Sequence, residues 1–352
     1  MAPTIVIAAG GTAGHVVPAL AVADVLRAEG AHVVFVGGER AERTLVPEAS
    51  YELRAIAVEG LSRSNPLKAA RAAAKAVGAV GTAARILRDV RPDAVMGGGG
   101  YVAGPVGLAA VVRRIPLVLT EADSHLGLSN RLLARFARRV CLAFPIPGRE
   151  GDRYLVTGRP VPPPATDVVA ARARFGLAEG EPCVLVFGGS LGARSINEAA
   201  VVAFAGAPYR VLHAAGTRDF AALRDRVPAG GGYDLREYIH DFGEALLATD
   251  LAVARAGGSI FEVAAHGRPA VLVPYPHASA DHQTANARWM ADAGAAVVVA
   301  DADLTPERLR AEVDGLLADP ARLQAMGRAS AALARPDAAQ RIAAELLAAA
   351  DA

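Results

Sequence analysis

Hydrophobic positions along the chain gather in short β-branched and aliphatic runs, which alternate with longer segments of helical spacing. The clearest short runs predict strands at Thr4–Ala8, His32–Val36, Leu117–Thr120 and Val184–Phe187. A repeated alternation of strand and helix is typical of parallel βαβ units. The pattern therefore predicts an α/β protein built on parallel sheets.

One local pattern occurs twice. The sequences IVIAAGGTAGH at Ile5–His15 and VLVFGGSLGAR at Val184–Arg194 each run from a strand through two glycines and a hydroxyl residue into a helix. Such a turn lets backbone N–H groups at a helix N-terminus point towards a phosphate. A tight turn without a ligand explains either copy alone equally well. Neither copy is a G-x-G-x-x-G sequence, which disfavours a nicotinamide dehydrogenase.

The repeated pattern predicts two Rossmann-like domains. Four prolines in Thr157–Ala165 exclude a continuous helix or a central strand, so we expect the connection between the domains there. The expected domains are an N-terminal one at residues 1–158 and a C-terminal one at residues 159–335. The final amphipathic helix, in residues 336–352, fits either domain, and a return to the N-terminal domain is one option.

Composition describes a compact chain of 352 residues, with 53% hydrophobic residues, 21% charged residues and a mean hydropathy of +0.28. The net charge is +1, but residues 1–158 carry +6 and residues 159–352 carry −5. This asymmetry predicts an anionic partner for the first half, such as a membrane surface or a phosphorylated ligand. Cys141 and Cys183 lie in apolar runs, so we expect buried free thiols in a reducing compartment.

The longest uncharged stretch, Ala94–Val112, contains six glycines and a proline, which favours a strand, a loop and a helix over a membrane span. The start of the chain has no basic segment, and Gly10 and Gly11 interrupt its apolar run, so a secretory signal is not expected. We therefore expect a cytoplasmic protein with peripheral contact to a membrane.

A basic segment between Leu61 and Arg91 is a candidate for that contact, because it holds seven basic residues and one acidic residue. Apolar positions recur there at helical spacing. We expect Lys68, Arg71 and Lys75 to face anionic lipid, and the alternative is that the apolar stripe packs on its own domain. A second candidate for the membrane face contains Arg135, Arg138 and Arg139.

Candidate catalytic residues follow the strands of the first half. His15 closes the first glycine turn at the start of a helix, where an imidazole suits a general base, and helix capping is the alternative. The glycine run Met96–Pro105 suits close approach of the backbone to a ligand. Glu121 and Asp123 follow a strand, at the edge where open α/β sheets bind ligands, although Asp123 fits a helix N-cap at least as well.

Two polar stretches of the second half suit a nucleotide sugar. In the sequence RAGGSIFE, Glu262 lies one turn into a helix and is placed to accept both hydroxyls of a ribose. The segment Pro274–Ala287 is rich in neutral donors and acceptors, which suits sugar hydroxyls, and a solvated loop is the alternative. The sequence Asp301–Asp303 has the letters of a metal motif, but we expect Asp303 or Thr305 to cap a helix and assign no metal.

Taken in order, the segments GGTAGH, GGGGYVAGP, GGSLGARSIN, RAGG with Glu262, and DHQTANA resemble the MurG family from Ile5 to the C-terminal helix. The resemblance implies two Rossmann-like domains facing across a cleft, the glycosyltransferase B fold. It implies inverting transfer of N-acetylglucosamine from UDP-N-acetylglucosamine to lipid I, which makes lipid II of peptidoglycan at the anionic inner face of the cell membrane. No metal, other cofactor or nucleic acid is implied.

The same resemblance implies roles for residues of the second half. Ser190 would bind the donor's phosphates, the backbone of Ile239 would hold uracil, and Glu262 would take the ribose. His282 and Gln283 would hold the N-acetylglucosamine.

The resemblance also implies that three residues of the first turn line the cleft near the donor: Thr12, Ala13 and Gly14. The remaining candidate binding residues are Tyr101, Arg159, Gly258 and Ser259. Candidates for the base are His15, Asp123 and Glu121. Two alternatives to this function stay open, another UDP-sugar transferase directed to a lipid or natural product, and a UDP-sugar-binding protein without catalysis.

Overall fold

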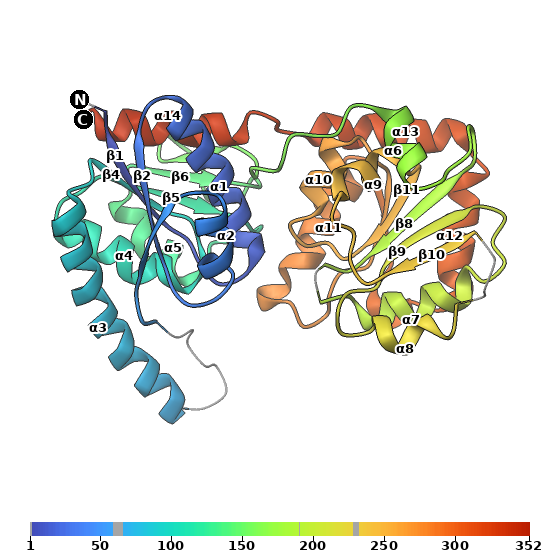
Figure 1. Cartoon of the computed structure of the whole chain (residues 1–352), viewed down its shortest axis with the longest axis horizontal. Helices are drawn as coiled ribbons and strands as arrows, with labels where there is room; N and C mark the ends of the chain where they lie inside the picture. Colours follow the sequence, from blue (N-terminus) through green and yellow to red (C-terminus); the bar gives the residue numbers. More distant parts are fainter. Residues whose placement is uncertain (1, 59–65, 190, 228–231) are drawn as a thin grey trace. The chain divides into compact units, whose positions relative to one another are not determined.

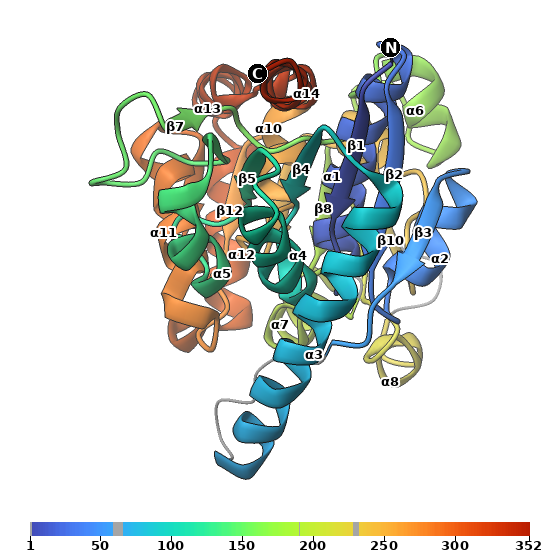
Figure 2. The same cartoon turned by 90° about the vertical axis from the view of Figure 1, so that its left-hand side faces the viewer.

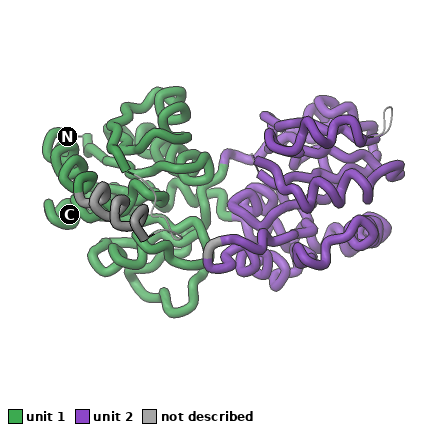
Figure 3. Tube along the Cα trace, turned by 90° about the horizontal axis from the view of Figure 1, so that it is seen from below, with its two compact units in different colours: residues 1–161, 335–352 green, residues 162–334 purple. Residues whose placement is uncertain are grey.

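The computed structural model describes residues 2–58, 66–189, 191–227 and 232–352, and for residues 66–77 and 279 it describes the backbone alone. The chain forms two compact units, residues 1–161 with 335–352 (unit 1) and residues 162–334 (unit 2), shown in Figure 3. Each unit is built on a parallel sheet covered by helices. The predicted class, an α/β protein with two Rossmann-like domains, is confirmed.

The sheet of unit 1 has the strand order β3-β2-β1-β4-β5-β6-β7, and every described pair is parallel. Its strands are β1 (Thr4–Ala8), β2 (His32–Gly37), β3 (Glu52–Ala55), β4 (Ala94–Gly97), β5 (Leu117–Glu121), β6 (Arg139–Leu142) and β7 (Tyr154–Val156).

Helices cover both faces of this sheet, because alternate side chains of a strand point to opposite faces. Ile5 and Ile7 of β1 join one core, and Val6 and Ala8 join the other. The helices over the first core are α1 (Ala13–Ala28), α2 (Glu42–Glu48) and α14 (Ala338–Ala350). Those over the second are α3 (Pro66–Val90), α4 (Gly100–Val112) and α5 (Leu128–Leu133), followed by the 3-10 turn η1 (Ala134–Phe136). Figure 2 shows α3 and α4 together on one face.

The last helix of the chain, α14, belongs to unit 1. Figure 1 shows it beside the first strands and helix of the chain, and it packs against α1. Ile342 and Leu346 are buried in the same core as Ile5 and Ile7. The end of the chain therefore completes the hydrophobic core that its beginning starts.

The apolar stripe predicted between Leu61 and Arg91 packs on its own unit in the part with described side chains. Val80, Ala84 and Leu87 of α3 lie against the second core. The alternative of ordinary packing is therefore correct for this half of α3. Lys68, Arg71 and Lys75 lie outside the described side chains.

Unit 2 has a parallel sheet in the order β10-β9-β8-β11-β12-β13. Its strands are β8 (Cys183–Phe187), β9 (Arg210–Ala214), β10 (Tyr233–Arg236), β11 (Leu251–Ala254), β12 (Ala270–Leu272) and β13 (Ala296–Val298). Its helices are α6 (Val168–Arg174), α7 (Arg194–Ala203), α8 (Phe220–Arg224), α9 (Phe242–Ala248), α10 (Ile260–Ala265), α11 (His282–Asp292), α12 (Pro306–Leu317) and α13 (Pro320–Leu333), with 3-10 turns η2 (Ser279–Asp281) and η3 (Asp301–Asp303).

Two smaller predictions are confirmed. Cys141 and Cys183 are buried free thiols. Thr305 caps α12, because its side chain accepts the backbone N–H of Arg308 at 3.1 Å. Asp303 instead ends η3, so of the two proposed caps it is the threonine that caps the helix.

A buried histidine organises the polar interior of unit 2. The Nδ1 atom of His213 lies 2.7 Å from the hydroxyl of Tyr233, and its Nε2 atom lies 3.0 Å from Oδ1 of Asn197. The amide nitrogen of Asn197 donates to Ala215 and Asp219, which leaves its oxygen as an acceptor. Nε2 of His213 therefore carries the proton and Nδ1 accepts from tyrosine. Burial lowers the pKa of His213 to about 3.

This shift predicts an acid-sensitive stability. Below pH 6.5 the unfolded chain binds a proton at His213 while the folded chain does not, until the pH approaches 3. The free energy of unfolding should then fall by about 1.4 kcal/mol per pH unit from this group. Urea denaturation of the wild type and of His213→Gln between pH 7 and pH 5 measures the effect. The variant should lose stability less steeply, and equal slopes would contradict the assignment. The exposed His32, as His32→Gln, is the control.

Candidate active site

The candidate residues lie in the loops that follow strands and in the first turns of the helices after those loops. Parallel strands bring their carboxyl ends to one edge of a sheet, where the connecting loops meet. In unit 1 the candidates follow or end β1, β4, β5 and β7, and in unit 2 they follow β8, β10, β11 and β12. The described candidates of each unit therefore lie towards the carboxyl edge of its sheet.

Two glycine loops of unit 1 touch each other through their backbones. Gly100 has φ = +74°, and a Cβ atom there would lie 2.0 Å from the carbonyl oxygen of Gly10. Only glycine fits so close an approach. The segment Met96–Pro105 consists of the end of β4, a short turn and the first residues of α4. Within it, Gly100 makes the contact between the loops, and Gly98 lies against Ala8 and Ala9 at the end of β1.

His15 is the third residue of α1 and does not cap it, since the N-cap is Thr12. The Nδ1 atom of His15 lies 3.3 Å from the hydroxyl of Thr12. A Cβ atom on Gly99 would lie 2.7 Å from Cδ2 of the imidazole, so the ring packs against the second glycine loop. The structure thus brings His15 to the junction of both loops, whereas Thr12, Ala13 and Gly14 are exposed at the N-terminus of α1.

The surroundings of His15 favour a neutral imidazole. Burial lowers its pKa, the guanidinium of Arg159 lowers it further, and Asp123 and Glu42 oppose these effects. The net shift lies below the ordinary value of 6.5. Arg159 is held beside the ring because its Nη2 donates to the carbonyl of Gly14. A neutral imidazole at neutral pH is the form that a general base requires.

Glu121 is buried and holds the loop that follows β5. One carboxylate oxygen accepts the N–H of Gly127 at 2.8 Å and the amide of Asn130 at 2.9 Å, and the other accepts the N–H of Asp123 at 3.2 Å. Burial raises the pKa of Glu121, and these hydrogen bonds oppose the rise. The contacts make Glu121 a support of the loop on which Asp123 lies.

Asp123 does not cap a helix, because α5 begins at Leu128 and its N-cap is Gly127. The capping alternative for Asp123 is therefore wrong. Its charge instead raises the pKa of His15, which places the two side chains in one electrostatic site.

A pocket of unit 1 opens between these groups. Its polar wall includes His15, Glu121 and Arg159, and its apolar wall includes Val22, Cys141 and Ile342. Ile342 comes from α14, so the end of the chain lines the same pocket as the first glycine turn. A mostly apolar pocket with a few convergent polar groups is the usual form of a small-molecule site.

The glycine turn of unit 2 repeats the arrangement of unit 1. Gly192 has φ = +79°, and a Cβ atom there would lie 1.9 Å from the carbonyl oxygen of Ala215. A Cβ atom on Gly216 would lie 2.1 Å from the nitrogen of Gly192. The turns after β8 and β9 thus meet backbone to backbone. Ser190, the predicted phosphate ligand, lies outside the described residues.

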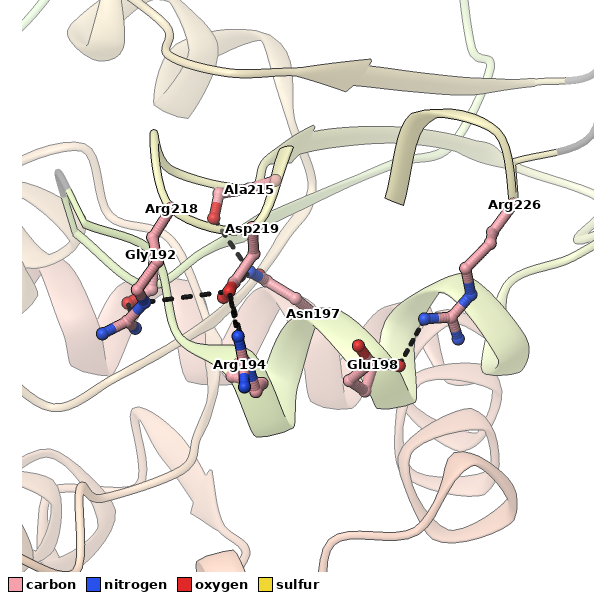
Figure 4. Close-up of polar contacts among 8 residues, drawn as sticks. All are labelled: Gly192, Arg194, Asn197, Glu198, Ala215, Arg218, Asp219 and Arg226. Atoms are coloured by element: carbon pink, nitrogen blue, oxygen red, sulfur yellow. Dashed lines mark hydrogen bonds and ion pairs between the residues drawn. The ribbon is translucent and has the colours of Figure 1, made fainter. Parts of the chain in front are cut away.

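Two arginines flank this turn, as Figure 4 shows. Arg194 and Arg218 share the buried carboxylate of Asp219, at 3.4 Å and 3.7 Å. Arg218 also lies within 3.4 Å of the carbonyl of Gly192, and Asp219 accepts from Asn197 at 3.1 Å. Guanidinium groups beside backbone amides suit a phosphate. Neither arginine was expected from the sequence, although Arg194 ends the segment GGSLGAR.

A second arginine cluster was also missed. The guanidinium of Arg255 donates to Asp301 at 2.5 Å, to Ser195 at 2.7 Å and to the carbonyl of Val273 at 3.1 Å. The contacts join the start of α7, the end of β12 and η3. Asp301 therefore has a structural partner in Arg255. Within the described ranges, no group of three His, Cys, Asp or Glu side chains could hold a metal ion.

The remaining donor-side candidates lie on adjacent loops of unit 2. Glu262 is the third residue of α10, whose N-cap is Ser259, and Gly258 immediately precedes that cap. His282 and Gln283 begin α11, and Oε1 of Gln283 accepts the N–H of Tyr275 at 3.0 Å.

Tyr275, Pro276 and His277 are exposed and lead into α11, so the alternative of a solvated loop before a helix stays open. Ile239 is buried between β10 and α9.

Comparisons with known proteins cover nearly the whole chain. Residues 5–142 match the glycosyltransferase family 28 N-terminal domain, and residues 183–342 match its C-terminal domain. A protein of Alkalilimnicola ehrlichii is 44% identical, and the match covers 97% of this chain and 98% of the relative. One of Halorhodospira halophila is 42% identical, covering 97% and 96%. Both are named UDP-N-acetylglucosamine--N-acetylmuramyl-(pentapeptide) pyrophosphoryl-undecaprenol N-acetylglucosamine transferase.

A solved structure is similar to this chain over nearly its whole length. The crystal structure of Acinetobacter baumannii MurG superposes with a TM-score of 0.81 at 31% identity, covering 99% of this chain and 100% of that one. Both glycine turns, the N-terminal and C-terminal family domains and the full-length matches agree. The chain belongs to the MurG family of glycosyltransferases, within glycosyltransferase family 28.

Proposed function

We propose that this chain transfers N-acetylglucosamine from UDP-N-acetylglucosamine to lipid I and so forms lipid II of peptidoglycan. The observation that carries the proposal is the match of both units to relatives of that name over 97% of the chain. A partial match would leave either the donor or the acceptor side unsupported. Here both carry their glycine turn and their polar loops.

The donor is assigned to unit 2. The turn at Gly192, with Arg194 and Arg218 beside it, supports binding of the diphosphate, and Glu262 on α10 supports binding of the ribose. As the UDP phosphates gain charge during transfer, preorganised N–H groups and guanidinium groups would stabilise that charge. His282 and Gln283 at the start of α11 would contact the sugar.

The acceptor is assigned to unit 1, with His15 as the base. Its neutral imidazole would take the proton of the acceptor hydroxyl, whose oxygen attacks the anomeric carbon as UDP leaves and the configuration inverts. Asp123 would then stabilise the imidazolium through its charge. Glu121 fits the base role less well, because both of its oxygens already accept hydrogen bonds.

An assay of UDP release tests the function. Wild-type protein should release UDP from UDP-N-acetylglucosamine when a lipid I analogue is present, and much less without it. Release with other UDP-sugars or other lipid acceptors would favour the alternative transferases. Binding of UDP-N-acetylglucosamine without release would favour a non-catalytic protein.

Glu262→Ala should weaken UDP itself. Hydrogen bonds from two ribose hydroxyls to a carboxylate are worth about 1.5 to 3 kcal/mol each, so a loss of at least tenfold in affinity is expected. Calorimetry with UDP measures it. Glu307→Ala is the matched control, since Glu307 also lies in the first turn of a helix of unit 2 and is exposed. An affinity within twofold of wild type, in a folded variant, would reject the ribose role.

His15→Ala should lower turnover by roughly 10² to 10⁴ and leave UDP affinity unchanged. The wild-type rate should fall as the pH drops through the lowered pKa of His15, because protonation removes the base. His32→Ala, an exposed histidine of unit 1, should keep wild-type kinetics. If His15→Ala keeps most of its turnover and Asp123→Ala loses it, Asp123 is the base.

A membrane face on α4, α5 and η1 is the third part of the proposal. None of the described helices combines the length and apolar content of a membrane span. Val112, Leu132 and Phe136 are 70%, 58% and 50% exposed. The exposed basic residues on the same elements and just beyond their ends are Arg113, Arg114, Arg131, Arg135 and Arg138.

These elements form one surface. The helices α4 and α5 pack closely, because a Cβ atom on Gly107 would lie 2.6 Å from the side chain of Leu133. Exposed apolar side chains among basic ones suit the surface of an anionic bilayer, where each basic residue contributes about 1 kcal/mol. A lipid-linked acceptor would be reached from such a surface.

Leu132→Ser with Phe136→Ser should therefore reduce sedimentation with vesicles that contain anionic lipid. Activity on vesicle-embedded lipid I should fall with it, while activity on a short-chain soluble acceptor stays within about twofold. Val168→Ser with Val169→Ser changes two exposed apolar residues of unit 2 and is the control. Unchanged vesicle binding would show that the membrane face lies elsewhere. The variant with Lys68, Arg71 and Lys75 replaced by glutamine then tests the basic segment of α3.

A further inference from the structure

Glu42 is a buried carboxylate for which the proposed reaction gives no role. It begins α2, directly after an exposed loop, yet its exposed fraction is 0%. Burying a carboxylate without compensating partners costs several kcal/mol of folding free energy. Buried carboxylates are therefore usually held by hydrogen bonds. Its partners therefore indicate why it lies there.

Glu42 has three partners from three different segments of unit 1. Oε2 of Glu42 accepts the N–H of Gly11 at 2.9 Å, after β1. Oε1 accepts the N–H of Gly38 at 2.8 Å, after β2, and the hydroxyl of Tyr101 at 2.8 Å, at the start of α4. Burial alone would raise the pKa of Glu42, but these hydrogen bonds outweigh it and hold the pKa below its ordinary value. The group is an anion at neutral pH.

The neighbouring glycines fit this carboxylate and its tyrosine partner. A Cβ atom on Gly10 would lie 2.8 Å from Oε1 of Glu42, and one on Gly37 would lie 2.7 Å from its Cγ. A Cβ atom on Gly38 would lie 2.1 Å from the hydroxyl of Tyr101. These glycines are needed to admit protein side chains, and the N–H of Gly11 is already bound to Glu42. The Gly10–Gly11 loop therefore packs against Glu42 and is held by a hydrogen bond to its carboxylate.

We propose that Glu42 is a positioning residue for glycosyl transfer, whose carboxylate fixes the Gly10–Gly11 loop and Tyr101 and places a constant negative charge behind His15. The role in transfer rests on the proposed function, whereas the fixing of the loop and the effect of the charge on His15 do not. It adds a residue that supports the base through the loop and through its charge.

The negative charge of Glu42 affects the pKa of His15 in one direction. The charged groups that act on the imidazole are Arg159, Asp123 and Glu42, and Glu121 lines the same pocket. The negative charge of Glu42 raises the pKa of His15. A neutral side chain at position 42 therefore lowers that pKa, and the acid limb of the rate profile moves to lower pH.

Glu42→Gln tests the proposal, because it keeps the shape and removes the charge. The amide group can accept from at most one side, so Gly11 or Gly38 loses its acceptor. We expect kcat/KM for a lipid I analogue to fall at least tenfold, the acid limb to move to lower pH, and calorimetric UDP affinity to stay within twofold. Glu39→Gln, a glutamate that is 71% exposed and paired with Arg43, should behave as wild type.

Tyr101→Phe is a second variant, which removes the hydroxyl that donates to Glu42 and keeps the carboxylate. It should lower kcat/KM without moving the acid limb, and the double variant should lose little more than Glu42→Gln, because both changes act through one contact. A folded Glu42→Gln with the wild-type rate and pH profile would overturn the proposal. Additive effects in the double variant would overturn the coupling between Glu42 and Tyr101.

A proton NMR titration of His15 separates this proposal from the proposed function. The resonance is assigned by its loss in His15→Ala, and the titration needs no turnover. A lower pKa of His15 in Glu42→Gln supports the placement of the charge even if lipid I is not the acceptor. An unchanged pKa would overturn that placement even in an active enzyme.

Discussion

Close contact between the backbones of neighbouring glycine turns is the constraint on which both candidate sites depend. In unit 1 a Cβ atom on Gly100 would lie 2.0 Å from the oxygen of Gly10, and in unit 2 one on Gly192 would lie 1.9 Å from the oxygen of Ala215. Each contact joins loops from adjacent parallel strands, β1 with β4 and β8 with β9. The glycines thus bring the two loops together and also leave helix N-termini open towards a ligand.

Buried side chains then hold loops near these turns in place, with carboxyl groups in unit 1 and a guanidinium group in unit 2. In unit 1 the carboxyl groups of Glu42 and Glu121 accept backbone N–H groups of the loops. In unit 2 the cation of Arg255 donates to backbone carbonyls and to Asp301. Loops fixed in this way present their side chains with little freedom to rearrange, which is the preorganisation that catalysis by charge stabilisation requires.

The charges around the two sites match their proposed ligands. Exposed Arg194 and Arg218 at the turn of unit 2 suit a diphosphate, although residues 159–352 carry a net charge of −5. In unit 1 burial and Arg159 keep His15 neutral, while Asp123 and Glu42 limit the fall of its pKa. Local arrangement, rather than the total charge of either half, therefore decides what each site can bind or deprotonate.

The sequence by itself determined the parallel α/β class, the two Rossmann-like units, the glycine turns and the family, because these follow from local periodicity and from short contiguous motifs. Only the tertiary structure decided that α14 completes unit 1, since an amphipathic helix packs equally well on any apolar face. It also decided that Glu42 and Arg255 are buried supports. Their partners lie from 4 to 60 residues away in the chain, and an acidic residue at a helix start looks locally like any charge at a helix terminus.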